Sequence, residues 1–166
     1  IWGFKIDYII DNEEQAANAR WDYEAQGWDP VTKTRVLGRK LPGDYEWRDR
    51  DGDNRITEYD QFELGRSVPH TVGGIGNTLT YKNFTLRIYM DYALGHSQLD
   101  EQFGYSMMST FNNNVAMPIQ ILDAWKEPGD AAKTKWARFA PHDTNEGRNY
   151  RRISDARLFK NDFLCI

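Results

Sequence analysis

Hydrophobic and polar residues alternate most regularly near the middle of the chain. From Phe84 to Leu94, every second residue is apolar or aromatic, and the residues between them are mostly polar. A period of two indicates a β-strand with one apolar face. The residues before Lys82-Asn83 alternate in the same way, and these two residues can form a short turn. The sequence therefore predicts a β-hairpin at 70–95 with its turn at 82–83.

The same pattern fixes which residues pair across the predicted hairpin. With the turn at 82–83, Tyr81 pairs with Phe84, and the pairing continues in step to Gly73 opposite Tyr92. A shift of one residue would mix apolar and polar side chains on both faces, so only this register separates them. The apolar face contains Leu79, Tyr81, Phe84, Leu86, Ile88, Met90 and Tyr92, and the polar face contains Thr78, Arg87, Tyr89 and Asp91.

Strands of about ten residues with one apolar face are typical of transmembrane β-barrels, where the apolar face meets lipid and the polar face lines the lumen. The same alternation also suits a long hairpin in a soluble β-sandwich. Loop length favours the barrel, because barrels have short periplasmic turns and long outer loops. The turn here has two residues, whereas about 60 residues precede the hairpin and about 60 follow it, which is unusual in a compact soluble domain. The predicted class is all-β, a segment of a large transmembrane antiparallel β-barrel whose long extracellular loops carry short helices.

The remaining segments are assigned around the hairpin. Two short helices are predicted in the loops. One spans 13–26 after a capping pattern, and the other lies within 111–130, with Pro118 near its first turn and residues 127–129 ending it. The chain is expected to be a piece of a longer polypeptide, because it opens in an apolar run and ends within a strand. The expected segments are a barrel strand end at 1–8, an extracellular loop at 9–69, the transmembrane hairpin with its periplasmic turn, a second extracellular loop at 96–155, and the start of the next barrel strand at 156–166.

Residues 49–60, DRDGDNRITEYD, resemble the calcium-binding loop of an EF-hand. Asp49, Asp51 and Asp53 occupy positions 1, 3 and 5, where carboxylates bind the ion. The backbone carbonyl of Arg55 falls at position 7, and Asp60 falls at position 12. Three carboxylates this close repel one another unless a cation neutralises them. The sequence favours a structural Ca²⁺ site, and the alternative is an Asp-rich turn held by the neighbouring arginines at 48, 50 and 55.

Composition excludes several other classes of protein. The 25 acidic and 21 basic residues give a net charge of −4, too balanced for a nucleic-acid groove. The single cysteine, Cys165, excludes an internal disulfide. The GGIGN segment at 73–77 lacks a third glycine and a following helix, so small residues for close packing explain it better than a nucleotide loop. No motif of nucleophilic or metal catalysis is present, and we do not expect an enzyme.

Four blocks of the sequence resemble one family. They are IWGFKIDYII, PGDYEWRDRDGDNRITEYDQFELGRSVPHTVGGIGNTLTYKNFTLRIYMDYALGH, ILDAWKEPGD and RRISDARLFKNDFLCI. Together they resemble the C-terminal half of SusC/RagA-like TonB-dependent outer-membrane transporters. The chain departs from the family pattern at Asn54, where Gly is usual, at His70, where Lys is common, and at Cys165, where Arg is frequent.

The resemblance implies a large barrel that imports oligosaccharides or peptides across the outer membrane of a Gram-negative, Bacteroidetes-like bacterium. It implies TonB as the energy source, a SusD-like surface lipoprotein as a lid, and the remainder of the barrel and its plug as partners. On this basis Arg87, Tyr89 and Asp91 would contact either passing solute or the plug, with the plug favoured. The tryptophans of the loops are expected to serve loop packing or contact with the lid rather than stacking on substrate. The alternative is a soluble, calcium-stabilised, β-rich module that binds glycans.

Overall fold

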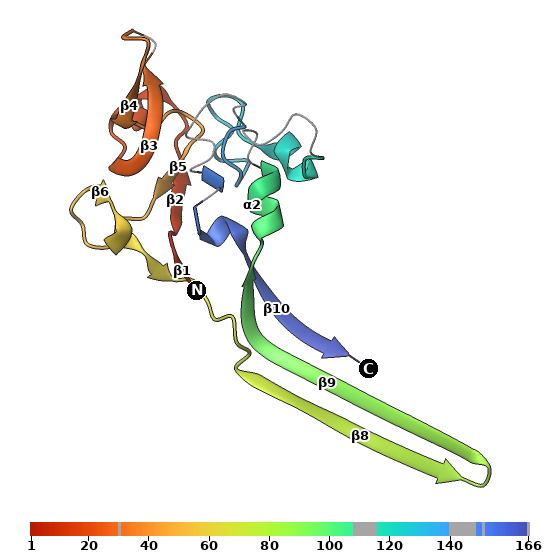
Figure 1. Cartoon of the computed structure of the whole chain (residues 1–166). Helices are drawn as coiled ribbons and strands as arrows, with labels where there is room; N and C mark the ends of the chain where they lie inside the picture. The colour runs from red at the N-terminus through yellow and green to blue at the C-terminus, as the bar shows by residue number, and fades with distance from the viewer. Residues whose placement is uncertain (30, 108–115, 140–148, 151, 166) are drawn as a thin grey trace. The chain divides into compact units, whose positions relative to one another are not determined.

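The computed structural model describes residues 1–29, 31–107, 116–139, 149–150 and 152–165. Strands dominate and helices are few and short, so the chain is of the all-β class (Figure 1). No helix in the described ranges has the length and apolar character needed to cross a membrane. The chain divides into two compact units. The hairpin unit comprises Ile1, Gly65–Leu99 and Leu158–Ile166, and the loop unit comprises Trp2–Leu64 and Asp100–Arg157.

The hairpin unit is an antiparallel sheet in the order β10-β9-β8. Strand β8 (Thr71–Tyr81) and strand β9 (Phe84–Leu99) are joined at Lys82-Asn83. Their pairing runs from Tyr81 opposite Phe84 to Gly73 opposite Tyr92 and beyond, which confirms the predicted register and turn. Lys82 has φ +52°, a conformation that favours glycine in tight hairpin turns. Strand β9 extends five residues past Leu94, where the predicted alternation ended.

Strand β10 (Leu158–Cys165) pairs antiparallel with the other edge of β9, which confirms a strand within the predicted segment 156–166. Leu164 lies opposite Tyr92, so it shares the apolar face of the sheet. The pairing shifts near Gly95, whose φ is +77° and whose N–H donates to Asp162 Oδ1 at 2.9 Å. Such a bulge adds a residue on one strand and bends it locally.

The glycines of β8 lie beneath tyrosine side chains of β9. A Cβ atom added to Gly73 would lie 2.5 Å from Tyr92 Oη, and one added to Gly76 would lie 3.3 Å from the Tyr89 ring. The GGIGN segment therefore lies within a strand and leaves room for tyrosines to lie across it. This packing of an aromatic side chain over a glycine on the neighbouring strand stabilises β-sheets that would otherwise be weakened by the glycine.

In the loop unit, residues 1–8 do not form one continuous strand. They form two short strands that pair inside the loop unit with residues from the predicted outer loop 9–69. The remaining strands of this region form a small mixed sheet, in which β3 pairs antiparallel with β4 and parallel with β6. The strands are β1 (Trp2–Gly3) with β7 (Phe62–Glu63), β2 (Ile6–Ile9) with β5 (Tyr45–Trp47), and β3 (Trp21–Asp29) with β4 (Thr34–Gly38) and β6 (Arg55–Ile56).

The first predicted helix is much shorter than expected. Helix α1 (Glu13–Ala17) begins after Asn12, whose side chain accepts from the Gln15 N–H at 2.9 Å. The prediction of a helix to residue 26 is wrong, because the chain enters strand β3 at Trp21. Contacts with distant segments override the local helix preference there, as they commonly do.

In the second half of the chain, a short helix does begin after Pro118, but it is the 3₁₀ turn η3 (Ile119–Asp123). Residues 111–115 of that prediction lie outside the described residues. Helix α2 (Glu101–Met107), which was not predicted from the sequence, is capped by Asp100, whose Oδ1 accepts from the Phe103 N–H at 2.7 Å. Two further 3₁₀ turns are η1 (Glu58–Asp60) and η4 (Asp155–Arg157).

The core of the loop unit is rich in aromatic side chains. Tyr45, Trp47 and Tyr150 are each almost fully buried, with ring centroids of Tyr45 5.5 Å from Trp47 and 5.9 Å from Tyr150. Phe103 packs against Trp136 at 5.0 Å, which brings helix α2 to the same core. Trp47 and Trp136 thus serve packing, as the sequence analysis favoured for the loop tryptophans.

Candidate functional site

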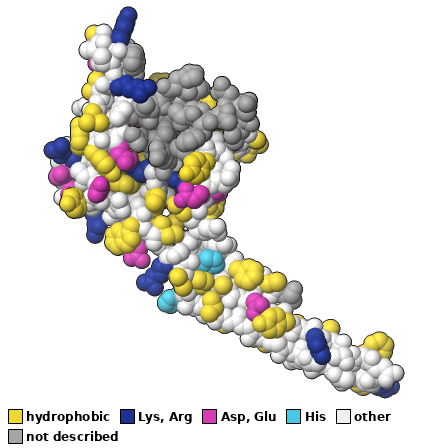
Figure 2. Space-filling view, in the orientation of Figure 1, with side chains coloured by type: hydrophobic (Ala, Val, Ile, Leu, Met, Phe, Trp, Pro, Cys, Tyr) yellow, Lys and Arg dark blue, Asp and Glu magenta, His cyan; other side chains and the backbone are white. Residues whose placement is uncertain are grey.

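The apolar face of the hairpin is open. Leu79 and Leu86, which pair across the strands, are both 56% exposed, and Phe84 at the turn is 79% exposed. Ile88 is also exposed, whereas Met90 and Tyr92 are half-buried. Figure 2 views the unit from a side on which charged side chains and histidines lie among the hydrophobic ones. Contiguous exposed apolar surface of this kind usually marks contact with a membrane or with another protein.

The polar residues predicted to line a lumen lie together on the opposite face. Thr78 pairs with Arg87, and Tyr89 and Asp91 lie opposite Gly76 and Gly74. In an antiparallel pair, directly opposed residues share a face, so the register places all four away from the apolar side. The sorting has exceptions on both faces: Asn77 lies opposite Ile88 on the apolar face, and Val72 lies opposite Ala93 on the polar face.

Both outer strands of this sheet have a free edge within the described part of the chain. β9 lies in the centre, and neither β8 nor β10 pairs with any other described strand. Each edge therefore presents backbone N–H and C=O groups with no partner in the sheet. Such edges tend to pair with another strand, and in lipid they would be prohibitively costly.

The acidic loop brings together the first three predicted metal ligands. A carboxylate oxygen from each of Asp49, Asp51 and Asp53 lies within 4.8 Å of the other two. Asp49 holds the loop, since its Oδ1 accepts from the Gly52 N–H at 2.6 Å and its Oδ2 from the Asn54 N–H at 2.8 Å. Asn54 adopts φ +66°, the left-handed conformation that glycine provides at this position of a calcium loop.

Asp60, the fourth predicted carboxylate ligand, is not part of this cluster. Asp60 is fully buried and caps turn η1, with Oδ2 accepting from the Thr57 N–H at 2.7 Å and Oδ1 from the Arg50 N–H at 2.8 Å. The structure does not bring it into the cluster of three, because both its oxygens are used in closing the loop. Arg55 donates its N–H to Asp53 Oδ1 at 2.8 Å and stacks its guanidinium on the Trp21 ring at 4.6 Å.

The negative charges of the three clustered aspartates are not neutralised by the neighbouring arginines. Within the described ranges, none of the three aspartates forms a salt bridge with the arginines at 48, 50 and 55, so ion pairing does not hold the turn. Partial burial acts to raise the pKa of Asp49, but the N–H groups of Gly52 and Asn54 outweigh it and lower that pKa. The Asp53 N–H lowers the pKa of Asp51, but desolvation and the neighbouring carboxylates outweigh it, so that pKa is raised. A hard cation would relieve this repulsion.

A buried arginine connects distant segments of the loop unit. The Arg152 side chain is only 3% exposed, and its Nη1 and Nη2 donate to Asp22 at 2.9 and 2.8 Å. Nη2 also donates to Glu24 Oε2 at 3.0 Å, and the guanidinium lies over the Phe4 ring at 4.4 Å. No local sequence pattern marks this cluster, because its members are about 130 positions apart.

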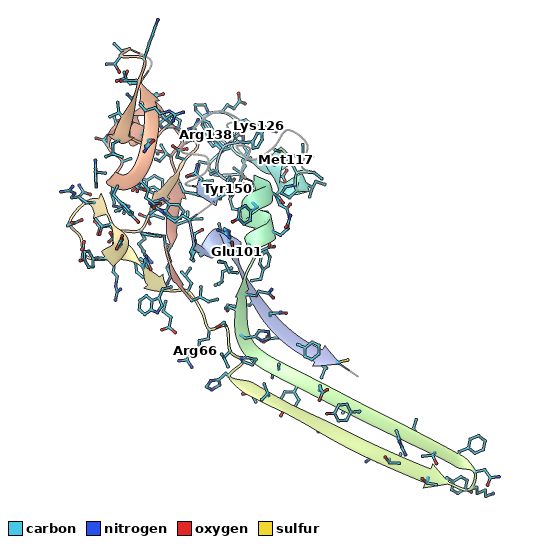
Figure 3. All side chains as sticks on the ribbon, viewed as in Figure 1. Arg66, Glu101, Met117, Lys126, Arg138 and Tyr150 are labelled. Atoms are coloured by element: carbon cyan, nitrogen blue, oxygen red, sulfur yellow. The ribbon has the colours of Figure 1, made fainter. Side chains whose placement is uncertain are left out.

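A further ion pair and a further arginine side chain are buried in the loop unit. Lys40 Nζ lies 3.0 Å from Glu46 Oε2, with both side chains almost completely buried. Burial lowers the pKa of Lys40 and raises that of Glu46, and each partner opposes the shift of the other. The Arg157 guanidinium donates to Glu101 at 2.6 Å and to the Tyr150 carbonyl at 3.2 Å (the last two residues are labelled in Figure 3). These pairs fix the fold rather than forming an open site.

The ILDAWKEPGD block is held by a single carboxylate. Asp11 Oδ1 accepts from Trp125 Nε1 at 3.0 Å, and the Gly129 N–H donates to Asp11 at 2.8 Å. The Ala131 N–H donates to the same oxygen at 3.2 Å. The Trp125 hydrogen bond is the main cause that lowers the pKa of Asp11.

The chain matches no protein-family model, and no curated protein matches it. The interpretation of its function therefore depends on the sequence pattern and on the geometry described above.

Proposed function

We propose that the chain is part of a TonB-dependent outer-membrane importer of the SusC/RagA type. In this proposal β8, β9 and β10 are neighbouring strands of the transmembrane barrel, with the turn at Lys82-Asn83 in the periplasm and the loop unit on the extracellular side. The importer would take up oligosaccharides or peptides, with energy from TonB and with a SusD-like surface lipoprotein as its lid.

One observation carries this proposal: an antiparallel sheet with a sorted, exposed apolar face and two open edges. Lipid would cover Leu79, Leu86 and the other exposed apolar side chains. Neighbouring barrel strands would pair with the outer edges of β8 and β10, because only a closed barrel removes all edges from the bilayer. The polar face with Arg87 and Asp91 would then meet the watery lumen or the plug.

The acidic loop fits a structural Ca²⁺ ion in this proposal. Calcium takes six to eight oxygen ligands, and the three clustered carboxylates would supply the charged part of that set, with water or carbonyl groups completing it. Bound there, the ion would hold residues 49–55 in the conformation that Asn54 and Gly52 already adopt. Asp60 would support the loop through its backbone contacts rather than bind the ion.

The second candidate is a soluble, calcium-stabilised module that binds glycans. The separate aromatic core of the loop unit and the clustered aspartates favour it. It would require another protein surface, rather than lipid, to cover the apolar face of the hairpin.

Membrane fractionation separates the two candidates. The polypeptide that contains this chain is expressed in a Gram-negative host, and its membranes are washed with alkaline carbonate and with urea. The importer should stay in the washed outer membrane, dissolve only in detergent, and show the heat-dependent gel mobility of a folded barrel. Release by carbonate into a soluble, monodisperse form would contradict the importer and support the module.

A further inference from the structure

A pocket of about 340 Å³ opens in the loop unit. Trp2 and Tyr23 contribute aromatic rings to its lining, and Glu24 and Gln61 contribute polar side chains. Its lining also includes Gly3, Phe4, Arg152 and Ile153. A concave surface that combines aromatic rings with a few polar groups is a common form of small-molecule site, and polar groups make up a large part of the lining here.

The charged groups of the pocket exclude most charged ligands. Arg152 already donates to Asp22 and Glu24, so two carboxylates surround one guanidinium. An anionic ligand would meet the two carboxylates, whose charge is only offset by Arg152 and by Arg50 beside Trp2. A cationic ligand would lie next to the Arg152 guanidinium, which already stacks on Phe4 at 4.4 Å and faces the Tyr23 ring at 5.6 Å. The pocket therefore suits an uncharged ligand.

The remaining polar groups can hydrogen-bond a ligand. Arg152 uses only the Oε2 atom of Glu24, whose side chain is 33% exposed. Within the described ranges, the Glu24 Oε1 atom, the Gln61 amide and the Tyr23 hydroxyl have no protein partner. A carboxylate oxygen accepts hydrogen bonds, and an amide or phenol both donates and accepts. Adjacent hydroxyl groups of a ligand would match this set.

Trp2 adds a flat apolar surface beside these polar groups. It is 53% exposed, and the guanidinium of Arg50 lies 5.8 Å from its ring centroid. Aromatic rings combine a large apolar surface with little loss of side-chain freedom on binding. A ligand that is neutral, flat and apolar on its ring faces, and lined with hydroxyl groups at its edge, satisfies all these features.

We propose that this pocket binds one uncharged pyranose unit of an oligosaccharide, with Trp2 against a ring face and Glu24 and Gln61 on its hydroxyl groups. This proposal rests on the proposed function in one respect: of the two substrate classes named for the importer, the pocket favours oligosaccharides over peptides. The pocket lies wholly in the loop unit, so its binding does not depend on the hairpin being in lipid.

The test is calorimetric titration of the purified, detergent-solubilised polypeptide with neutral glucose, galactose and mannose disaccharides. Glucuronic acid and trialanine serve as charged and peptide comparisons. Saturable binding of at least one neutral disaccharide is expected, with weaker or no binding of the two comparisons. Trp2→Ala should weaken the binding about tenfold or more, as truncation of a central aromatic contact typically does. Trp2→Phe should retain most of it.

Gln61→Leu keeps the side-chain volume and removes only the amide, so it tests the site even if Trp2→Ala fails to fold. Tyr59→Ala is the matched control, because Tyr59 is 81% exposed in the same unit but does not line the pocket. Binding that is absent for all neutral sugars, or equal in the wild type and Gln61→Leu, would overturn the proposal. If sugars bind while the polypeptide fails to enter membranes, only the importer proposal is refuted. If the polypeptide inserts into membranes without binding sugars, only the pocket proposal is refuted.

Discussion

The sharpest prediction concerns a lysine placed at different depths on the apolar face of the hairpin. Residues on a strand tilted by about 45° advance roughly 2.4 Å per residue along the membrane normal. Ile88 is four positions from Phe84 at the turn, which places it about 10 Å deeper, close to the middle of an apolar band about 25 Å tall. Phe84 would lie at the interface.

The expected cost follows from these depths. A lysine at the bilayer midplane of a barrel costs about 2–4 kcal/mol, and one near the interface costs about 0–1 kcal/mol. Ile88→Lys should therefore lower the equilibrium constant for folding and insertion by a factor between about 30 and several hundred, because 1.4 kcal/mol corresponds to a factor of ten. Phe84→Lys should have little effect. Thr85→Lys, on the polar face of the same strand, is the matched control and should be tolerated.

The assay is the unfolding free energy of the complete barrel in lipid vesicles, with heat-dependent gel mobility as an independent measure of folding. The order of destabilisation expected is Ile88→Lys far above Phe84→Lys and Thr85→Lys. Equal effects at Ile88 and Thr85 would show that the two faces do not meet different environments. An equally large effect at Phe84 would show that the face is buried against protein along its whole length, since a protein contact has no depth dependence.

Three further outcomes are expected. Ca²⁺ at ten times its dissociation constant should stabilise the wild type by about 1.4 kcal/mol, so the melting temperature should be higher with Ca²⁺ than with a chelator. In the double variant Asp51→Asn/Asp53→Asn this difference in melting temperature should vanish, and a difference that persists would refute the metal site. Arg152→Met should lower the free energy of unfolding in urea by about 3–5 kcal/mol, because it leaves Asp22 buried without its cation. Adding Asp22→Asn should restore part of that stability, and a loss of stability as small as at an exposed arginine would contradict this role of Arg152. The pKa of Asp11 is lowered in the folded state, so the contribution of its carboxylate to stability is complete above the ordinary pKa of 3.8 and is lost as the pH falls through the folded pKa. Asp11→Asn should flatten that part of the curve of unfolding free energy against pH, and an unchanged curve would refute the role of the carboxylate.

The hairpin was predictable because all of its information is local. A period of two specifies the strand, and a two-residue turn leaves one register in which Tyr81 meets Phe84 and the faces stay separate. The sequence did not mark the end of β9 at Leu99, because the alternation stops at the bulge near Gly95. The bulge depends on a side chain more than 60 positions away, that of Asp162.

The loop unit was less predictable because its structure depends on distant partners. The helix expected to reach residue 26 ends at Ala17, and the next residues enter a strand whose Asp22 pairs with Arg152. Strands such as β1 and β6 contain only two residues, too few to show any periodicity. The acidic loop is intermediate: the spacing of three aspartates located the cluster, but the capping role of Asp60 depends on how turn η1 closes.

The two features of the hairpin unit place different demands on its surroundings. An apolar face alone could be covered by a soluble partner, and an open edge alone could be paired by any strand. Here one face is apolar over most of two strands, and both edges of the sheet are open within the described residues. A soluble module would need one partner for the face and a strand at each edge. A barrel in lipid satisfies both demands at once, because closure pairs the edges and the bilayer covers the face. This is why the importer is the more economical of the two candidates, and why the lysine series at Phe84, Thr85 and Ile88 tests its central assumption.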